Sequence, residues 1–237
     1  MPGSMLKSGA RKIIINNFPQ VLIISLIYVV LTTVVSWFAV RLPGNLSIEE
    51  INARLASGEI PSLGIIYTNF RPAGIFLALL MLILQPLLEV GFISYCLKLK
   101  RDQKTDFRDL FNGIILFFKV LAIFLITTFY ILLWSLLLII PGIIASYRYR
   151  QAYYILLDDP RKSALQCISE SRIIMHGKKL DLFTIDISFF GWFVLDMLVF
   201  FIIPLPFTIP FISIWLSPYL CLTRAAFYED SISKVAV

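Results

Sequence analysis

Five long apolar runs dominate the chain, and the short stretches between them carry most of its charges. Each run has more than 20 residues, and a helix of ~20 apolar residues, rising 1.5 Å per residue, spans the hydrocarbon of a bilayer. A sixth and shorter apolar stretch follows the pair Pro141-Gly142. We therefore predict membrane-crossing helices at 18–40, 73–97, 113–140, 142–157, 180–203 and 207–227.

The short stretch at 142–157 decides the topology. Because Pro141 and Gly142 break a helix and permit a tight reversal, we interpret 113–157 as a helical hairpin; the alternative is one helix kinked at Pro141. Lys and Arg concentrate on the cytoplasmic side of membrane proteins. With six crossings and a cytoplasmic N-terminus, 18 of the 21 Lys and Arg residues face the cytoplasm. A single kinked helix would instead place the basic cluster at 161–179 outside. The charge count favours six crossings of the cell membrane, with both termini cytoplasmic.

Two short helices are predicted in the loops on either side of the membrane. In the outer loop, 41–72, Ser47 followed by Glu50 forms a capping-box pattern next to apolar residues that share one helical face. In the cytoplasm, Asp159 is suited to cap an amphipathic helix at 160–176, which starts with a proline and is stopped by the glycine that follows it. The predicted fold class is therefore all-α: one integral membrane domain over 1–237, a polytopic transmembrane bundle of about six helices plus short amphipathic helices on each side.

Composition agrees with this fold. Hydrophobic residues make up 59% of the chain and charged residues 15%, with a mean hydropathy of +0.85, whereas soluble domains are about 45–50% apolar. The net charge of +6 would suggest nucleic acid in a soluble protein, but in a membrane protein it records sidedness, so we expect no nucleic-acid partner. The three cysteines lack metal-ligand spacing, and we expect neither a metal site nor a disulfide framework.

Several ionisable residues fall inside the apolar runs. The candidates for an intramembrane charge network are Glu89, Arg148, Arg150, Asp186, Asp196 and Arg224. By helical rise, Glu89 and Asp186 lie roughly 10–13 Å from the cytoplasmic ends of their helices, and we expect the three arginines at a similar depth. We hypothesise a buried network that lines a cavity open to the cytoplasm. The alternative, which we favour, is structural: the arginines extend to the inner headgroups and nearby tyrosines form an interfacial belt.

Asp196 stands apart from the other carboxylates. It lies ten residues beyond Asp186, about 15 Å farther along the same predicted helix and on a different face. It has no obvious basic partner in the sequence. This makes Asp196 the best single candidate for a carboxylate linked to function, against the alternative that it bonds a hydroxyl of a neighbouring helix.

The search for catalytic chemistry is mostly negative. His176 is the single histidine and precedes a glycine at a predicted helix end, where a partly positive side chain favours the helix dipole. We find no zinc-protease pattern, no phosphate-binding glycine loop and no serine nucleophile elbow, and we expect no catalytic residues and no cofactor. Four basic residues instead form a candidate basic inner face for anionic headgroups: Arg161, Lys162, Lys178 and Lys179.

The order of several short motifs between residues 90 and 230 resembles a known family. These motifs include Glu89-Val90-Gly91-Phe92, Asp109-Leu110-Phe111-Asn112-Gly113, Ile140-Pro141-Gly142-Ile143, Ser188-Phe189-Phe190-Gly191-Trp192, Pro218-Tyr219 and Ala226-Phe227-Tyr228. Together they are similar to an uncharacterised family of multi-pass integral membrane proteins from Gram-positive bacteria. The Ile-Pro-Gly-Ile element also resembles one in the membrane domains of some glycerophosphodiester phosphodiesterases. The resemblance implies a helical membrane fold in a bacterial cell membrane and supplies no activity.

Three classes of function remain. We expect a non-enzymatic integral membrane module that interacts with membrane lipid, with anionic headgroups at the cytoplasmic face, or with a protein partner or a second copy of itself. The alternative is a small transporter or channel-like protein that uses the intramembrane carboxylates. A lipid-modifying enzyme is third, because it needs a reactive cluster that the sequence does not display.

Overall fold

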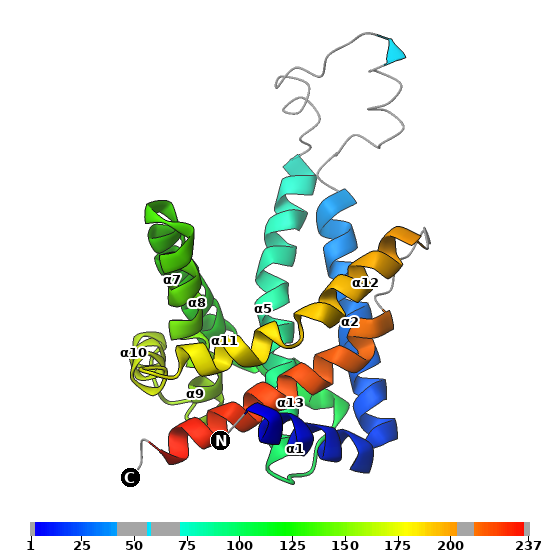
Figure 1. Ribbon diagram of the computed structural model, residues 1–237. Coiled ribbons are helices and arrows are strands. Elements are labelled where there is room, and N and C mark those ends of the chain that lie inside the picture. Colours follow the sequence, from blue (N-terminus) through cyan, green and yellow to red (C-terminus); the bar gives the residue numbers. More distant parts are fainter. Residues whose placement is uncertain (1–2, 42–55, 58–71, 203–210, 235–237) are drawn as a thin grey trace. The chain divides into compact units, whose positions relative to one another are not determined.

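The computed structural model describes residues 3–41, 56–57, 72–202 and 211–234, and every regular element within these ranges is a helix (Figure 1). The predicted all-α class is therefore confirmed. The chain divides into two compact units, one formed by Met1–Val29 with Pro86–Val237 and the other by Val30–Gln85. The larger unit contains every site discussed below. The helix predicted in the outer loop after Ser47 lies outside the described residues.

Two described segments are long and apolar enough to cross a membrane, Leu82–Lys100 and Phe117–Leu137. The first belongs to α5 (Pro72–Lys100) and the second is α7. A third candidate consists of α1 (Gly3–Asn16) and the first part of α2 (Phe18–Arg41), which meet at a bend of 101°. The described residues thus contain two or three candidate spans, fewer than the six predicted.

Helix α1 is an element that the sequence analysis did not predict. Its residues Leu6, Ala10 and Ile14 recur every four positions, so they share one helical face, and all three are buried. Helix α1 lies against α13 (Phe211–Ser233), the last described helix (Figure 1), and Leu6 belongs to the same buried cluster as Ala226 and Phe227 of α13. The N-terminal basic segment is therefore an amphipathic helix that packs on α13 within the larger unit.

The predicted reversal near Pro141 is present, but it occurs three residues earlier. Leu138 is extended, with φ −161° and ψ 151°, and α8 (Ile139–Tyr149) begins directly after it. Pro141 lies in the first turn of α8, where a missing N–H breaks no helical bond. Gly142 packs so closely on α7 that an added Cβ would lie 2.0 Å from Ser135 Oγ. The two helices lie side by side as an antiparallel hairpin (Figure 1).

The second arm of this hairpin is not one continuous helix. With 11 residues, α8 is about 16 Å long by helical rise, roughly half of a bilayer's hydrocarbon thickness. The chain then continues, after Arg150 and Gln151, into α9 (Ala152–Asp158). The segment predicted to cross at 142–157 is therefore built from two short helices.

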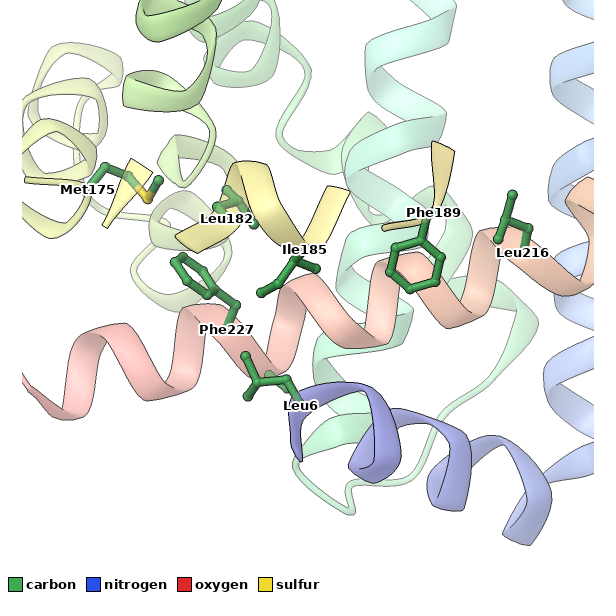
Figure 2. Packing of buried hydrophobic residues seen from close by; sticks show 8 residues of the cluster. Leu6, Met175, Leu182, Ile185, Phe189, Leu216 and Phe227 are labelled. Carbon is green, nitrogen blue, oxygen red and sulfur yellow. The ribbon is translucent and has the colours of Figure 1, made fainter. Parts of the chain in front are cut away.

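The helix predicted over 180–203 is also broken. It consists of α11 (Lys179–Ile187) and α12 (Phe190–Ile202), separated by Ser188 and Phe189. The ring of Phe189 is 1% exposed and packs edge-to-face on Tyr219 of α13, with centroids 5.0 Å apart. At this break the ring enters a hydrophobic core between α1, α11 and α13 (Figure 2). The members of this core are Leu6, Met175, Leu182, Ile185, Phe189, Leu216, Ala226 and Phe227.

The cytoplasmic helix predicted from Pro160 starts later. It is α10 (Ala164–Ile174), and its N-cap is Ser163 rather than Asp159. Ser163 and Gln166 form a reciprocal capping box, in which the side chain of each accepts a hydrogen bond from the backbone N–H of the other. The prediction that a glycine stops this helix is confirmed, because Gly177, three residues after the end of α10, adopts a left-handed φ of +76°.

Candidate functional site

A cavity of about 300 Å³ lies within the larger unit. Helices α2, α5, α7, α8, α9 and α13 all contribute to its wall. The lining combines three charged residues with aromatic, hydroxyl-bearing, cysteine and aliphatic side chains: Tyr28, Glu89, Phe92, Ile93, Ile123, Thr127, Ile131, Ser146, Tyr149, Arg150, Tyr153, Tyr154, Ser217, Leu220, Cys221 and Arg224. Three residues of the predicted charge network, Glu89, Arg150 and Arg224, therefore meet in one cavity.

Arg224 is bound by a fourth member of that network. Its Nε donates to Asp186 Oδ1 at 3.0 Å, and the Tyr147 hydroxyl donates to Asp186 Oδ2 at 3.1 Å. The side chains of Arg224 and Asp186 are only 20% and 13% exposed. This partly buried ion pair links α13 to α11 beside the cavity and neutralises one of its two guanidinium groups.

Glu89 and Arg150 are arranged differently. Glu89 is exposed to the cavity, and the described part of the chain offers its carboxylate no hydrogen bond or ion pair. Arg150 lies with its guanidinium 5.9 Å from the ring centroid of Tyr147, and no carboxylate among the described residues pairs with it. Among the described residues, the cavity wall thus holds two opposite charges that do not contact each other.

The wall formed by α7 is apolar. Ile123, Thr127 and Ile131 follow at intervals of four, so they lie on one helical face, and all three line the cavity. The Thr127 hydroxyl donates to the Ile123 carbonyl at 2.6 Å, so its polar group is satisfied within the helix. The resulting apolar strip is about 12 Å long by helical rise. The cavity is thus amphipathic, with charges from α5, α8 and α13 and an aliphatic side on α7.

Two predicted members of the network do not join this cavity. Asp196 on α12 accepts a hydrogen bond from Ser213 of α13 at 2.7 Å, which is the arrangement that we set against a functional role for it. Arg148 is not part of the cavity wall, and its backbone carbonyl accepts a hydrogen bond from Ser171 of α10 at 2.9 Å. Both residues hold helices together in this structure.

The candidate basic inner face is only partly available to a ligand. Lys162 pairs with Glu170 at 2.7 Å, and this hydrogen bond raises the pKa of Lys162 above its usual value. Lys178 donates to the Ser231 carbonyl at 2.9 Å. Arg161 is exposed and Lys179 half-buried, and neither forms an ion pair within the described residues. Two of the four basic groups are therefore engaged in holding α10 and α13.

A cluster of charges that sequence reasoning missed lies at the ends of three helices. Arg101 donates to Asp158 at 2.7 Å and, through Nε, to Glu229 at 2.7 Å. Tyr228 donates to Asp158 at 2.7 Å. The hydrogen bond to Asp158 raises the pKa of Arg101, while burial and the Asp158 carboxylate raise the pKa of Tyr228. We call Arg101, Asp158, Tyr228 and Glu229 the helix-end clasp. The charges of this cluster were visible in the sequence, but Arg101 entered the sequence analysis only as one of the basic residues assigned to the cytoplasmic side.

A second missed contact anchors the segment between α5 and α7. The carboxylate of Asp109 is bound by Lys98 at 2.5 Å, by the backbone N–H of Asp106 at 2.9 Å and by Asn112 at 3.3 Å. Gly91 of α5 approaches this segment so closely that a Cβ would lie 1.7 Å from the Leu110 carbonyl oxygen. The motifs around Gly91 and Asp109 therefore serve packing.

Among the described residues, no group of three or more His, Cys, Asp or Glu side chains is placed to hold a metal ion. Residues 135–235 match the family described as "Protein of unknown function (DUF975)". This match covers Arg150, Asp186 and Arg224 and supports an uncharacterised family, in agreement with the motif resemblance. No curated protein and no solved structure matches the chain.

Proposed function

We propose that this chain is a non-enzymatic integral membrane protein whose cavity holds a membrane lipid. The observation that carries the proposal is the amphipathic cavity, in which charged side chains and an apolar strip of α7 line the same space. A lipid has the same division, since its headgroup is charged and its acyl chains are apolar. The 300 Å³ volume suits a headgroup with the first part of a chain, because ligand pockets measure about 300–1,000 Å³.

Membrane insertion is part of the proposal and rests on apolar exposure. At the tip of the hairpin, five consecutive residues are 68–87% exposed: Leu136, Leu137, Leu138, Ile139 and Ile140. The described face of α12 is similarly exposed and apolar, including Phe190, Trp192 and Met197. Patches of this kind mark membrane or protein contacts. We propose the six-crossing arrangement in the cell membrane, with both termini and α10 in the cytoplasm.

The topology is tested by reporter fusions that are active on only one side of the membrane. Fusions after residues 101, 177 and 237 are expected to report the cytoplasm, and a fusion at Leu138 the outside. A cytoplasmic signal at Leu138 would show that the α7–α8 hairpin does not cross.

Lipid binding is tested by narrowing the apolar strip. The full chain is purified from membranes, and the lipid bound per protein is measured by extraction and mass spectrometry. Ile131→Trp places an indole in the cavity and is expected to reduce bound lipid at least fivefold. Its neighbour Leu132 is 63% exposed and lies outside the cavity, so Leu132→Trp is the matched control. Equal lipid in both variants and in the unmodified chain would contradict a lipid in this cavity.

A small transporter is the second candidate, favoured by the carboxylate of Glu89, which faces the cavity without a partner among the described residues. Carboxylates inside a membrane commonly serve ion or proton movement. Proteoliposomes loaded with a pH dye distinguish the two candidates. A proton flux in the unmodified chain that is lost in Glu89→Gln would favour transport. If the unmodified chain and Glu89→Gln both leak protons no faster than protein-free liposomes, the lipid-binding module is favoured.

A further inference from the structure

We infer that the cavity selects a zwitterionic phospholipid headgroup, with its ammonium group at Glu89 and its phosphate at Arg150. This inference rests on the proposed function and names the chemistry of the bound lipid. The cavity wall holds charges of both signs, and two of them have no ionic partner among the described residues.

Arg224 adds no net charge to the cavity. Its guanidinium is already bound by Asp186 at 3.0 Å, so the pair carries no net charge toward the cavity. Two charges then remain in the wall, the carboxylate of Glu89 and the guanidinium of Arg150. They have opposite signs, and the cavity as a whole is neutral.

Glu89 and Arg150 do not neutralise each other. They line the same cavity from α5 and from the turn between α8 and α9, yet no N–O distance of 4.0 Å or less joins them. A ligand that bridges them must present a cation to one wall and an anion to the other. A phosphate and an ammonium group joined by a two-carbon linker have this arrangement.

The donor and acceptor types also match. A carboxylate without a protein partner accepts hydrogen bonds from the N–H groups of an ammonium ion, and a guanidinium binds two phosphate oxygens in parallel. An anionic headgroup would satisfy Arg150 but bring a negative charge toward Glu89. A purely cationic ligand would satisfy Glu89 and leave Arg150 unpaired. The zwitterion is the class that leaves neither charge alone.

The experiment compares two lipids with identical acyl chains on the full-length protein. The purified chain is stripped of native lipid by detergent exchange and titrated with phosphatidylethanolamine or phosphatidylglycerol, and bound lipid is counted by native mass spectrometry. We expect at least tenfold preference for phosphatidylethanolamine. Glu89→Gln should remove this preference by weakening phosphatidylethanolamine and strengthening phosphatidylglycerol. Arg150→Gln should weaken both.

Matched controls remove charges of the same sign outside the cavity. Asp181 and Arg161 are exposed and do not line it, so Asp181→Asn and Arg161→Gln are expected to leave the preference unchanged. Because the Glu89 carboxylate binds no described group, Glu89→Gln removes no internal bond. An unchanged melting temperature checks that this variant remains folded.

The outcomes separate this inference from the proposed function. Tighter binding of phosphatidylglycerol, or a preference that Glu89→Gln leaves intact, overturns the zwitterionic headgroup while lipid binding stands. Binding of neither lipid overturns both. If an equal concentration of soluble phosphoethanolamine displaces phosphatidylethanolamine, the zwitterionic ligand is supported and its source is a soluble molecule. That result would contradict the proposed lipid-binding function.

Discussion

Asp186 of α11 and Arg224 of α13 are 38 positions apart in the chain and form an ion pair with an Nε–Oδ1 distance of 3.0 Å. The two helices also share the core around Phe189 and Phe227. The pair therefore fixes the lateral position of two helices and, at the same time, holds the Arg224 side chain at the cavity.

Removing one partner of this pair should destabilise the protein. Asp186→Leu leaves the Arg224 guanidinium partly buried without its carboxylate, and we expect a loss of about 3 kcal/mol in the free energy of unfolding. The double variant Asp186→Leu with Arg224→Met should recover most of this loss, since neither charge then remains. Unfolding in detergent, followed by circular dichroism, measures both. A double variant as unstable as the single one would show that the pair is not the cause.

Gly91 should tolerate no side chain. A Cβ at this position would lie 1.7 Å from the Leu110 carbonyl oxygen, so Gly91→Ala forces apart α5 and the segment that follows it. Overpacking of this kind costs about 1–3 kcal/mol, which thermal unfolding of the purified chain detects.

Gly9 is the matched control for this substitution. It lies in α1 with nothing within 4 Å of the added Cβ, and Gly9→Ala should be neutral or stabilise by up to about 1 kcal/mol. Similar losses at both positions would contradict the close approach of α5 and Leu110.

The helix-end clasp should contribute modestly to stability. Its ion-pairing side chains are 26–36% exposed, and a double-mutant cycle with Arg101→Gln and Asp158→Asn is expected to give a coupling of about 1 kcal/mol. The coupling should fall as salt screens the charges. Arg108 is 83% exposed and lies 3.9 Å from Asp106, and Arg108→Gln should leave stability unchanged. If no coupling is measured at low salt, the helix-end clasp does not stabilise the fold.

The capping box of α10 should be measurable as well. Ser163→Ala removes the oxygen that accepts from the Gln166 backbone N–H, at an expected cost of about 1 kcal/mol. Ser169→Ala changes an exposed hydroxyl within the same helix, which donates to the Gln166 carbonyl and bonds no other described residue. Urea unfolding of the two variants should therefore differ. Equal midpoints would indicate that α10 starts elsewhere.

The helical class was predictable because runs of more than 20 apolar residues are typical of long apolar helices. The breaks within those runs were less predictable. The interruption at Phe189 has no proline or glycine beside it on its N-terminal side, and its ring turns inward because Tyr219 packs against it. Helix α1 was missed although Leu6, Ala10 and Ile14 have helical spacing in the sequence, because this segment was considered only for the sidedness of its basic residues.

The candidate site divides in the same way. Charges within apolar runs are rare and costly, so Glu89, Asp186 and Arg224 were visible in the sequence as residues that need an explanation. Their pairing was not, because several carboxylates and arginines share a similar predicted depth. Contacts between distant helices place Asp186 on Arg224 and Asp196 on Ser213. They leave Glu89 facing the cavity.

By itself the sequence determined the helical class, the apolar segments, the reversal near Pro141 and the list of charges within apolar segments, since these depend on composition and on local backbone chemistry. Only the tertiary structure decided which helices break, which charges pair and that a cavity exists whose wall holds one charge of each sign without an ionic partner among the described residues. Those outcomes depend on packing between residues far apart in the chain, where a shift of a few ångströms separates an ion pair from two single charges.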